Sequence, residues 1–326
     1  MECMTVQRAL GFALASLPFL SGVAGAADAY PAKPLRLIVN TAPGGSTDIV
    51  ARIIGAQLGE RLNAQIVVDN RGGAGGAIGM DTAAKAAPDG HTLLLANASL
   101  TTLPALRKLP YDPLKSFAPI AKLASVYLAL VVHPAVEAKS VQEFIALARR
   151  KPGAVIFSGS GPGAHTTMAT ELFKSMSGVD VLVVEYKSGG PAVIDLIGGH
   201  THAMLATIPS VLPHVKAGKL KVLATSGAKR SNLLPDAPTI DSAGVPGYST
   251  VQWHGILAPA GTARRITDLL HVELQAILAS EDGRKRLIGA GAEIDYLPPG
   301  EFGLFIRRDM EQWSQLVLKA GIKLRE

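Results

Sequence analysis

The residues best suited to chemistry form a short polar turn directly after an apolar segment at residues 35–39. Glycines at positions 44 and 45 permit a tight turn, and the Ser, Thr and Asp that follow are residue types that cap a helix N-terminus. The first turn of a helix carries unpaired N–H groups and a partial positive charge, which suit a carboxylate or phosphate. An ordinary capped helix would explain the same residues. As an anion site, the turn would bind its ligand through Thr41, Gly44, Gly45, Ser46 and Thr47, with Asp48 ordering water or an amine.

A second turn of the same kind occupies residues 158–165, between an apolar segment at 155–157 and a predicted helix at 166–177. Two such turns predict two half-sites that face each other across a cleft. His165 at the start of the helix is a candidate ligand contact, although a backbone group could equally satisfy it. The candidates for the far side of the ligand are Ser158, Ser160, Gly161 and His165, joined by Asn97 at a strand end and by the phenol of Tyr186.

Known cofactor, metal and catalytic patterns are not matched. The glycines at 159–163 and 73–76 lack the dinucleotide-binding spacing, and Gly218-Lys219 precedes leucine, so it is not a P-loop. His200 and His202 have no third ligand near them in sequence, whereas zinc sites need three or four. Neither Ser46 nor Ser160 stands in a Gly-x-Ser-x-Gly elbow. We therefore expect no cofactor, no metal and no catalytic residue, with a secreted α/β hydrolase acting on a small ester or acid as the alternative.

The elements that position these turns alternate strand with helix from residue 35 to residue 97, which predicts a mostly parallel sheet covered by helices. In such sheets, ligands bind beyond the carboxyl ends of the strands. An extended apolar segment at 120–133 predicts a crossing into a second α/β domain, and the last helices are expected to rejoin the first. The predicted domains are residues 28–130 with 250–326, and residues 131–249.

Composition and the N-terminal segment limit the possible functions. Residues 1–27 combine a basic start, an apolar run and small residues, which is typical of a cleaved secretory signal and predicts a periplasmic protein. The only cysteine, Cys3, lies within that segment, so the mature chain has no disulfide. The net charge of +6 is scattered along the chain and aromatic residues make up 5%, which argues against nucleic-acid binding. A mildly positive surface does favour small anions.

Several motifs together resemble the Bug-type solute receptors of tripartite tricarboxylate transporters, over essentially the whole mature chain. The matching segments are Pro34-Leu35-Arg36-Leu37-Ile38-Val39, Ala42-Pro43-Gly44-Gly45-Ser46-Thr47-Asp48, Val68-Asp69-Asn70-Arg71, Pro88-Asp89-Gly90, Lys216-Ala217-Gly218-Lys219-Leu220 and Leu234-Pro235-Asp236-Ala237-Pro238-Thr239.

This resemblance implies a two-domain, type II-like periplasmic-binding-protein fold that closes on a small carboxylate. It also implies delivery to a permease of one large and one small subunit, and we expect the receptor to be a monomer. A receptor that docks on a membrane sensor is a further alternative. Five positions depart from the family pattern and leave the identity of the carboxylate open, namely Asn40, Thr41, Glu185, His202 and His254.

Overall fold

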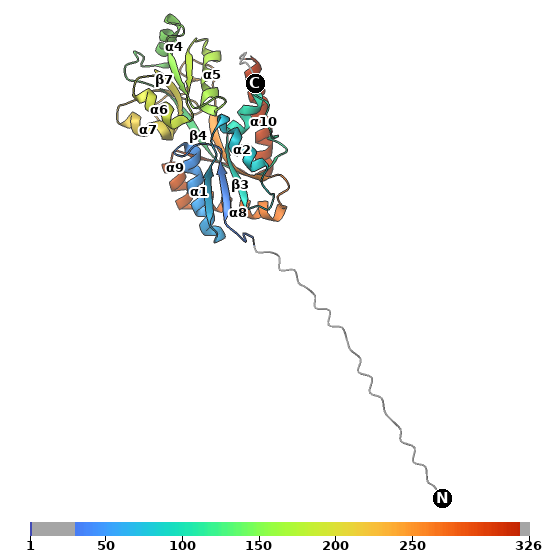
Figure 1. The fold of residues 1–326 in the computed structure, drawn as a ribbon. Coiled ribbons are helices and arrows are strands. Elements are labelled where there is room, and N and C mark those ends of the chain that lie inside the picture. The colour runs from blue at the N-terminus through green and yellow to red at the C-terminus, as the bar shows by residue number, and fades with distance from the viewer. Residues whose placement is uncertain (2–29, 320–326) are drawn as a thin grey trace.

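The computed structural model, which describes Met1 and residues 30–319, is an α/β structure of alternating strands and helices (Figure 1). The predicted signal segment at 1–27 lies outside the described residues, apart from Met1. The strands are β1 Leu35–Val39, β2 Ile66–Asn70, β3 Thr92–Asn97, β4 Phe117–Val132, β5 Ile156–Gly159, β6 Leu182–Glu185, β7 Ala203–Thr207, β8 Lys221–Thr225, β9 Val251–Pro259 and β10 Glu293–Leu297. The helices are α1 Ser46–Leu62, α2 Ala77–Ala84, α3 Ser99–Thr102, α4 Val141–Arg150, α5 His165–Ser177, α6 Gly189–Ile197, α7 Ile208–Lys216, α8 Arg264–Ala279, α9 Glu281–Gly289 and α10 Pro299–Lys319, with short 3₁₀ turns at Ala74–Gly76 and Leu103–Ala105.

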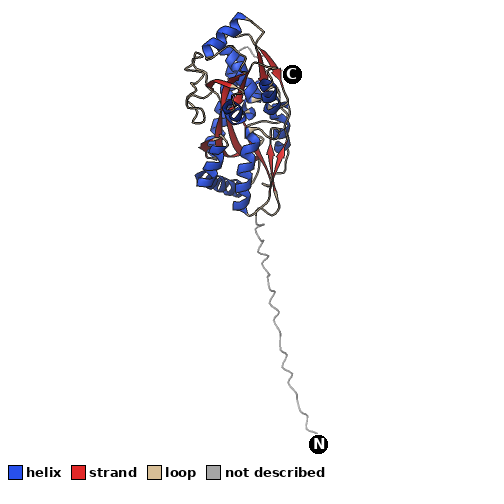
Figure 2. Ribbon diagram, turned by 90° about the vertical axis from the view of Figure 1, so that its left-hand side faces the viewer, coloured by secondary structure: helices blue, strands red, loops and turns tan. Residues whose placement is uncertain are grey.

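The strands follow one continuous path in the order β2-β1-β3-β9-β4-β7-β5-β6, with β8 and β10 paired to β4. The outer strands are parallel at both ends of this path, as the strand–helix alternation predicts. The central pairs that involve β4 and β9 are antiparallel, because these two strands carry the chain between the two ends in opposite directions. Figure 2 shows the helices on both sides of the strands.

The long strand β4 joins two lobes. Up to Tyr127 it pairs with β9 and β10, and from Leu128 onward it pairs with β7 and β8. We call the part built on β1, β2, β3, β9 and β10 the first lobe, and the part built on β5 to β8 the second lobe. The sequence predicts the crossing at 120–133 but not β10, a short strand at the edge of the first lobe. The predicted domain boundaries themselves stay a prediction.

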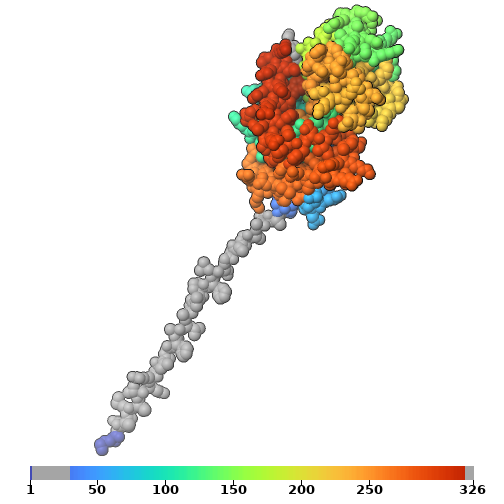
Figure 3. Space-filling model, turned by 180° about the vertical axis from the view of Figure 1, so that it is seen from behind, coloured from blue at the N-terminus to red at the C-terminus, as the bar shows by residue number. Residues whose placement is uncertain are grey.

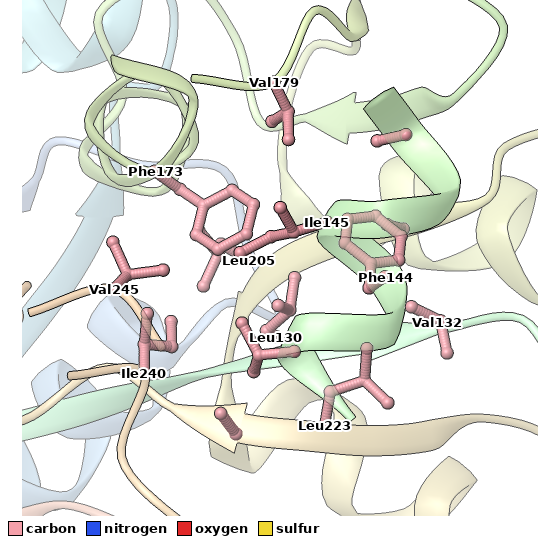
Figure 4. Close-up of a cluster of buried hydrophobic side chains, with 14 of the residues drawn as sticks. Leu130, Val132, Phe144, Ile145, Phe173, Val179, Leu205, Leu223, Ile240 and Val245 are labelled. Atoms are coloured by element: carbon pink, nitrogen blue, oxygen red, sulfur yellow. The ribbon is translucent and has the colours of Figure 1, made fainter. Parts of the chain in front are cut away.

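Each lobe has its own apolar core. In the first lobe, alternate residues of β3 enter two different clusters, one beneath α1 and α8 and the other beneath α2 and α10. This alternation covers both faces of the sheet. In the second lobe, Phe144 of α4 packs with Phe157 and Phe173. Figure 4 shows Phe144 and Phe173 within this cluster of buried side chains.

The C-terminal helix α10 packs on the first lobe and also reaches the second. Its residues Phe302 and Ile306 join the first-lobe cluster around Trp253. Farther along, Trp313 packs with Met168 of α5. Figure 3 shows α10, in dark red, standing as a column beside the residues of the second lobe. The helix therefore spans the junction of the lobes.

Candidate functional site

A cavity of about 340 Å³ lies between the two lobes. Both hydroxyl-bearing turns predicted from the sequence reach it, one from each lobe. Its lining comprises Asn40, Thr41, Ala42, Pro43, Gly44, Gly45, Ser46, Thr47, Gly73, Gly75, Gly76, Asn97, Ser99, Ser160, Ala164, His165, Thr166, Lys187, Ser188, Gly189, Gly190, Val193, Ile194, Met204, Thr207, Ser210, His214 and Gln252. No aspartate or glutamate side chain is among these residues.

The first-lobe turn is arranged differently from the predicted cap. Gly44 has a φ of +85°, which favours glycine, and Gly45 is the N-cap of α1. The carboxylate of Asp48 reaches back and accepts a hydrogen bond from the Gly44 N–H at 2.9 Å. Because Asp48 fastens the turn, Ser46 and Thr47 do not act as caps.

The hydroxyl groups of this turn are oriented by residues from distant parts of the chain. Gln252 of β9 donates through Nε2 to Ser46 Oγ at 2.9 Å. Asn97, at the end of β3, donates through Nδ2 to Thr47 Oγ1 at 3.1 Å. Since the oxygen of Ser46 accepts a bond, its own proton is available to a ligand.

Asp48 is only 4% exposed and does not line the cavity. It also accepts hydrogen bonds from Arg52 Nε at 3.1 Å and from Asn70 Nδ2 at 3.0 Å. Burial alone would raise the pKa of Asp48, but the hydrogen bonds from Arg52, Gly44 and Asn70 outweigh it and lower the pKa below its usual value. The carboxylate is therefore charged at neutral pH and holds the turn.

We expect Asp48→Asn to lower the free energy of unfolding by about 1–3 kcal/mol at pH 7, because a buried, charged acceptor of three hydrogen bonds is lost. A lowered folded-state pKa gives stability that is present above the unfolded pKa of about 3.9 and is lost as pH falls through the folded value. The difference between wild type and variant should therefore shrink below about pH 4 in urea unfolding series. A constant difference from pH 7 to pH 2 would contradict this role.

The second-lobe turn places His165 at the start of α5, 2% exposed and within the cavity lining. Its Nε2 lies 3.1 Å from Thr250 Oγ1, and its ring meets Trp313 edge to face at 5.5 Å between centroids. Burial lowers the pKa of His165 to about 3. The imidazole is therefore neutral at physiological pH and offers a hydrogen bond rather than a charge.

Five helix N-termini converge on this cavity, because the N-cap residues of α1, α2, α5, α6 and α7 all line it. None of these five caps makes a side-chain capping bond. By contrast, Ser140 and Ser280 cap α4 and α9 with their hydroxyls. Helix N-termini attract anions through their free N–H groups and their dipole. The cavity thus has a positive lining, to which exposed Lys187 adds a full charge.

Buried polar atoms without a hydrogen-bond partner gather at the cavity. Half of the ten such side-chain atoms in the described part of the chain belong to cavity residues. They are Asn40 Oδ1, Thr41 Oγ1, Ser160 Oγ, His165 Nδ1 and Thr166 Oγ1. Leaving a buried polar group unpaired costs about 1–3 kcal/mol. Such a concentration is typical of a ligand site rather than of a packed core.

Eight of the twelve predicted site residues line the cavity, and four do not. Asp48 fastens the turn, and Ser158 shares a 2.6 Å hydrogen bond with Thr201. The Gly161 N–H donates to Glu185 at 2.9 Å. Tyr186 donates its hydroxyl to Asp195, and burial together with this carboxylate raises the pKa of Tyr186 to about 12. As ligand contacts, these four stay predictions that the cavity does not support.

The residues that depart from the family pattern fall into two groups. Asn40 and Thr41 line the cavity, whereas Glu185, His202 and His254 do not. His202 accepts a hydrogen bond at Nδ1 from the Ile156 N–H at 2.9 Å. The Nε2 atom of His254 lies 3.2 Å from Thr47 Oγ1, on the side of Thr47 away from the cavity. These two histidines therefore support the walls rather than face a ligand.

Sequence reasoning did not include Gln252, Lys187 or the starts of α6 and α7 among the candidate site residues. The pair Gly189-Gly190 at the start of α6 resembles Gly44-Gly45 and could have indicated a further helix N-terminus at the site. Nothing near Gln252 in the sequence indicates its approach to Ser46, 206 residues away.

Comparison with known proteins fits this geometry. Residues 50–322 match the family model described as the tripartite tricarboxylate transporter family receptor. The chain belongs to this receptor family. Protein BugT of Bordetella pertussis is 36% identical over 302 residues, covering 92% of this chain and 93% of BugT.

Solved structures similar to this chain share its fold. The R. palustris protein Rpa4515, solved with adipate, has a TM-score of 0.87 at 33% identity and covers 90% of this chain and 99% of its own. MatC from Rhodopseudomonas palustris, solved with bound malate, has a TM-score of 0.83 at 30% identity and covers 88% of this chain and 100% of its own. The two-domain fold of periplasmic binding proteins expected from the sequence is thereby confirmed.

Among residues 30–319, no group of three or more His, Cys, Asp or Glu side chains is placed to hold a metal ion. Within the same residues, none of the helices has the length and apolar character needed to cross a bilayer.

Proposed function

We propose that this receptor binds a small organic carboxylate in the cavity between its lobes and delivers it to a membrane permease. The observation that carries the proposal is the convergence of five uncapped helix N-termini on a cavity with no acidic side chain in its lining. An anion gains from every one of these groups, whereas a cation would face them without a counter-charge. The similar structures solved with adipate and with malate support an organic acid as the ligand.

In the first lobe, the carboxylate is held by the N–H groups at the start of α1 and by the hydroxyls of Ser46 and Thr47, with Thr41 and Asn97 beside them. In the second lobe, Ser160, His165 and the start of α6 hold the far end of the ligand. Groups from both lobes are needed to surround the ligand, so binding favours the closed arrangement of the lobes. The strand crossings at β4 and β9 form the hinge, close to the predicted domain boundaries at residues 130 and 250.

The proposal includes three further points. The permease has one large and one small subunit, the receptor is a monomer, and the protein is exported by a signal that is cleaved near residue 27. The family supports a non-enzymatic receptor. A secreted hydrolase on this architecture would turn its ligand over. A sensor-docking receptor would bind a membrane partner other than the permease.

Stoichiometric binding of a carboxylate is the expected result for the purified mature chain. A ligand present at about 100 times its Kd should add about 2.7 kcal/mol to the free energy of unfolding. A thermal-shift panel of mono-, di- and tricarboxylates measures this, and mass spectrometry of acid released from freshly purified protein identifies the natural ligand. No stabilisation by any acid in the panel, or turnover of one, would contradict the proposal.

A further inference from the structure

Asn40, directly after β1, is a cavity residue whose carbonyl oxygen has no partner. The side chain is 1% exposed and belongs to the cavity lining. Its Nδ2 donates to Asn97 Oδ1 at 3.0 Å, whereas its Oδ1 accepts no hydrogen bond. The Asn40 amide therefore donates a hydrogen bond within the protein through its nitrogen, while its oxygen can still accept one from a ligand.

A backbone group fixes the orientation of this amide. The Ser99 N–H donates to Asn97 Oδ1 at 3.0 Å, and a backbone N–H is always a donor. Asn97 must therefore present its oxygen on this side, consistent with its Nδ2 donating to Thr47 Oγ1. If Asn40 were turned round, two carbonyl oxygens would face each other, so its free atom is the oxygen.

This acceptor lies next to the proposed carboxylate position. Asn97 bonds both Asn40 and Thr47, so the free oxygen stands beside the start of α1. The start of α1 offers donors, including the free proton of Ser46. Asn40 Oδ1 instead repels a carboxylate oxygen and requires an N–H or O–H group on the ligand.

The charges around the cavity indicate whether the ligand donates to Asn40 through an N–H or an O–H group. An ammonium group would need a negative partner, and no acidic side chain lines the cavity. The nearby carboxylate of Asp48 is already engaged by the Gly44 N–H, Arg52 and Asn70. With five helix N-termini around it, the site favours an uncharged hydroxyl over an amine.

We propose that the ligand is a 2-hydroxycarboxylate and that Asn40 is a specificity-determining residue, accepting the hydrogen bond of the hydroxyl group. This inference rests on the proposed function, since the hydroxyl is placed relative to a carboxylate bound at the start of α1. Removing the hydroxyl leaves Asn40 Oδ1 buried and unpaired, and such a loss weakens binding more than the loss of an exposed hydrogen bond.

Matched acids that differ in one group test the inference on wild-type protein by isothermal titration calorimetry. The pairs are malate with succinate, 2-hydroxyglutarate with glutarate, and lactate with propionate, with aspartate as the amine counterpart of malate. In the pair of the best-fitting length, the hydroxy acid should bind at least about tenfold more tightly than the unsubstituted acid. Aspartate should bind more weakly than malate.

The variant Asn40→Ala removes the acceptor and should reduce the ratio of the two affinities to about one, mainly by weakening the hydroxy acid. Asn232→Ala, at an exposed position outside the cavity lining, is the matched control and should keep the wild-type ratio. The wild-type pairs decide the question even if Asn40→Ala does not fold.

The outcomes separate this inference from the proposed function. Equal affinity for hydroxylated and unsubstituted acids, or the same ratio in Asn40→Ala, overturns the role of Asn40 and leaves a carboxylate receptor. Tighter binding of aspartate than of malate overturns the choice of a hydroxyl. Binding of no acid at all overturns both.

Discussion

Replacing Ser46 with aspartate is expected to abolish carboxylate binding while leaving the fold intact. Ser46 is the first residue of α1 and lines the cavity, so the new carboxylate would occupy the proposed anion position. Two like charges about 4 Å apart repel by about 4 kcal/mol at an effective dielectric constant of 20. We therefore expect at least about a 100-fold loss of affinity in calorimetric titration.

The same substitution should not weaken the ligand-free protein, because an acidic residue in the first turn of a helix is stabilising by about 0.3–1 kcal/mol. Asp48, two residues further on, is already a carboxylate in the first turn of α1. Ser46→Asn, similar in size and uncharged, is the control and should lose less than about tenfold in affinity. Wild-type affinity in Ser46→Asp would mean that the start of α1 does not hold the carboxylate.

Replacing Phe144 with alanine should lower the free energy of unfolding by about 3–5 kcal/mol. Phe144 is fully buried, and its ring centroid lies 5.7 Å from that of Phe157 and 6.4 Å from that of Phe173. Figure 4 shows Phe144 and Phe173 among the buried side chains of this cluster. The three rings come from α4, β5 and α5, so the cavity left by alanine would border elements that converge from separate parts of the chain. These elements also carry the second-lobe turn, and their loosening would disturb that half of the site.

Urea unfolding followed by near-ultraviolet circular dichroism measures this loss as a lower midpoint of the second-lobe transition. Leu182→Ala is the control, because Leu182 is 52% exposed and its removal should change stability by less than about 0.5 kcal/mol. If Phe144→Ala also changed the free energy of unfolding by less than about 0.5 kcal/mol, the three rings would not be stabilising the second lobe.

Much of the site could be predicted from short-range signals. A glycine turn followed by Ser, Thr and Asp marks a helix start at residue 46, and the helix begins there. The same reasoning applied to residues 158–165 predicts a helix from residue 166, and α5 begins one residue earlier, at His165. Both signals are local, because capping chemistry and the spacing of apolar residues act within a few residues.

The interior of the site could not be predicted in this way. Asp48 was expected to order water or an amine, but the folded turn brings the Gly44 N–H, Arg52 and Asn70 to it from three directions. The Asp48 carboxylate therefore makes its hydrogen bonds within the protein and stabilises the turn. Likewise, His254 lies outside the cavity lining, because it packs behind Thr47 rather than beside it.

By itself, the sequence determined the alternation of strands and helices, the family, and the two hydroxyl-bearing helix starts, because each depends on neighbours along the chain. Only the tertiary structure decided that Ser46 and Ser160 line one cavity and that Gln252 orients Ser46 across 206 residues. It also decided that the oxygen of Asn40, not its nitrogen, is free. Those features depend on which groups packing brings together in space, and hydrogen-bond directions are fixed only once donor and acceptor meet.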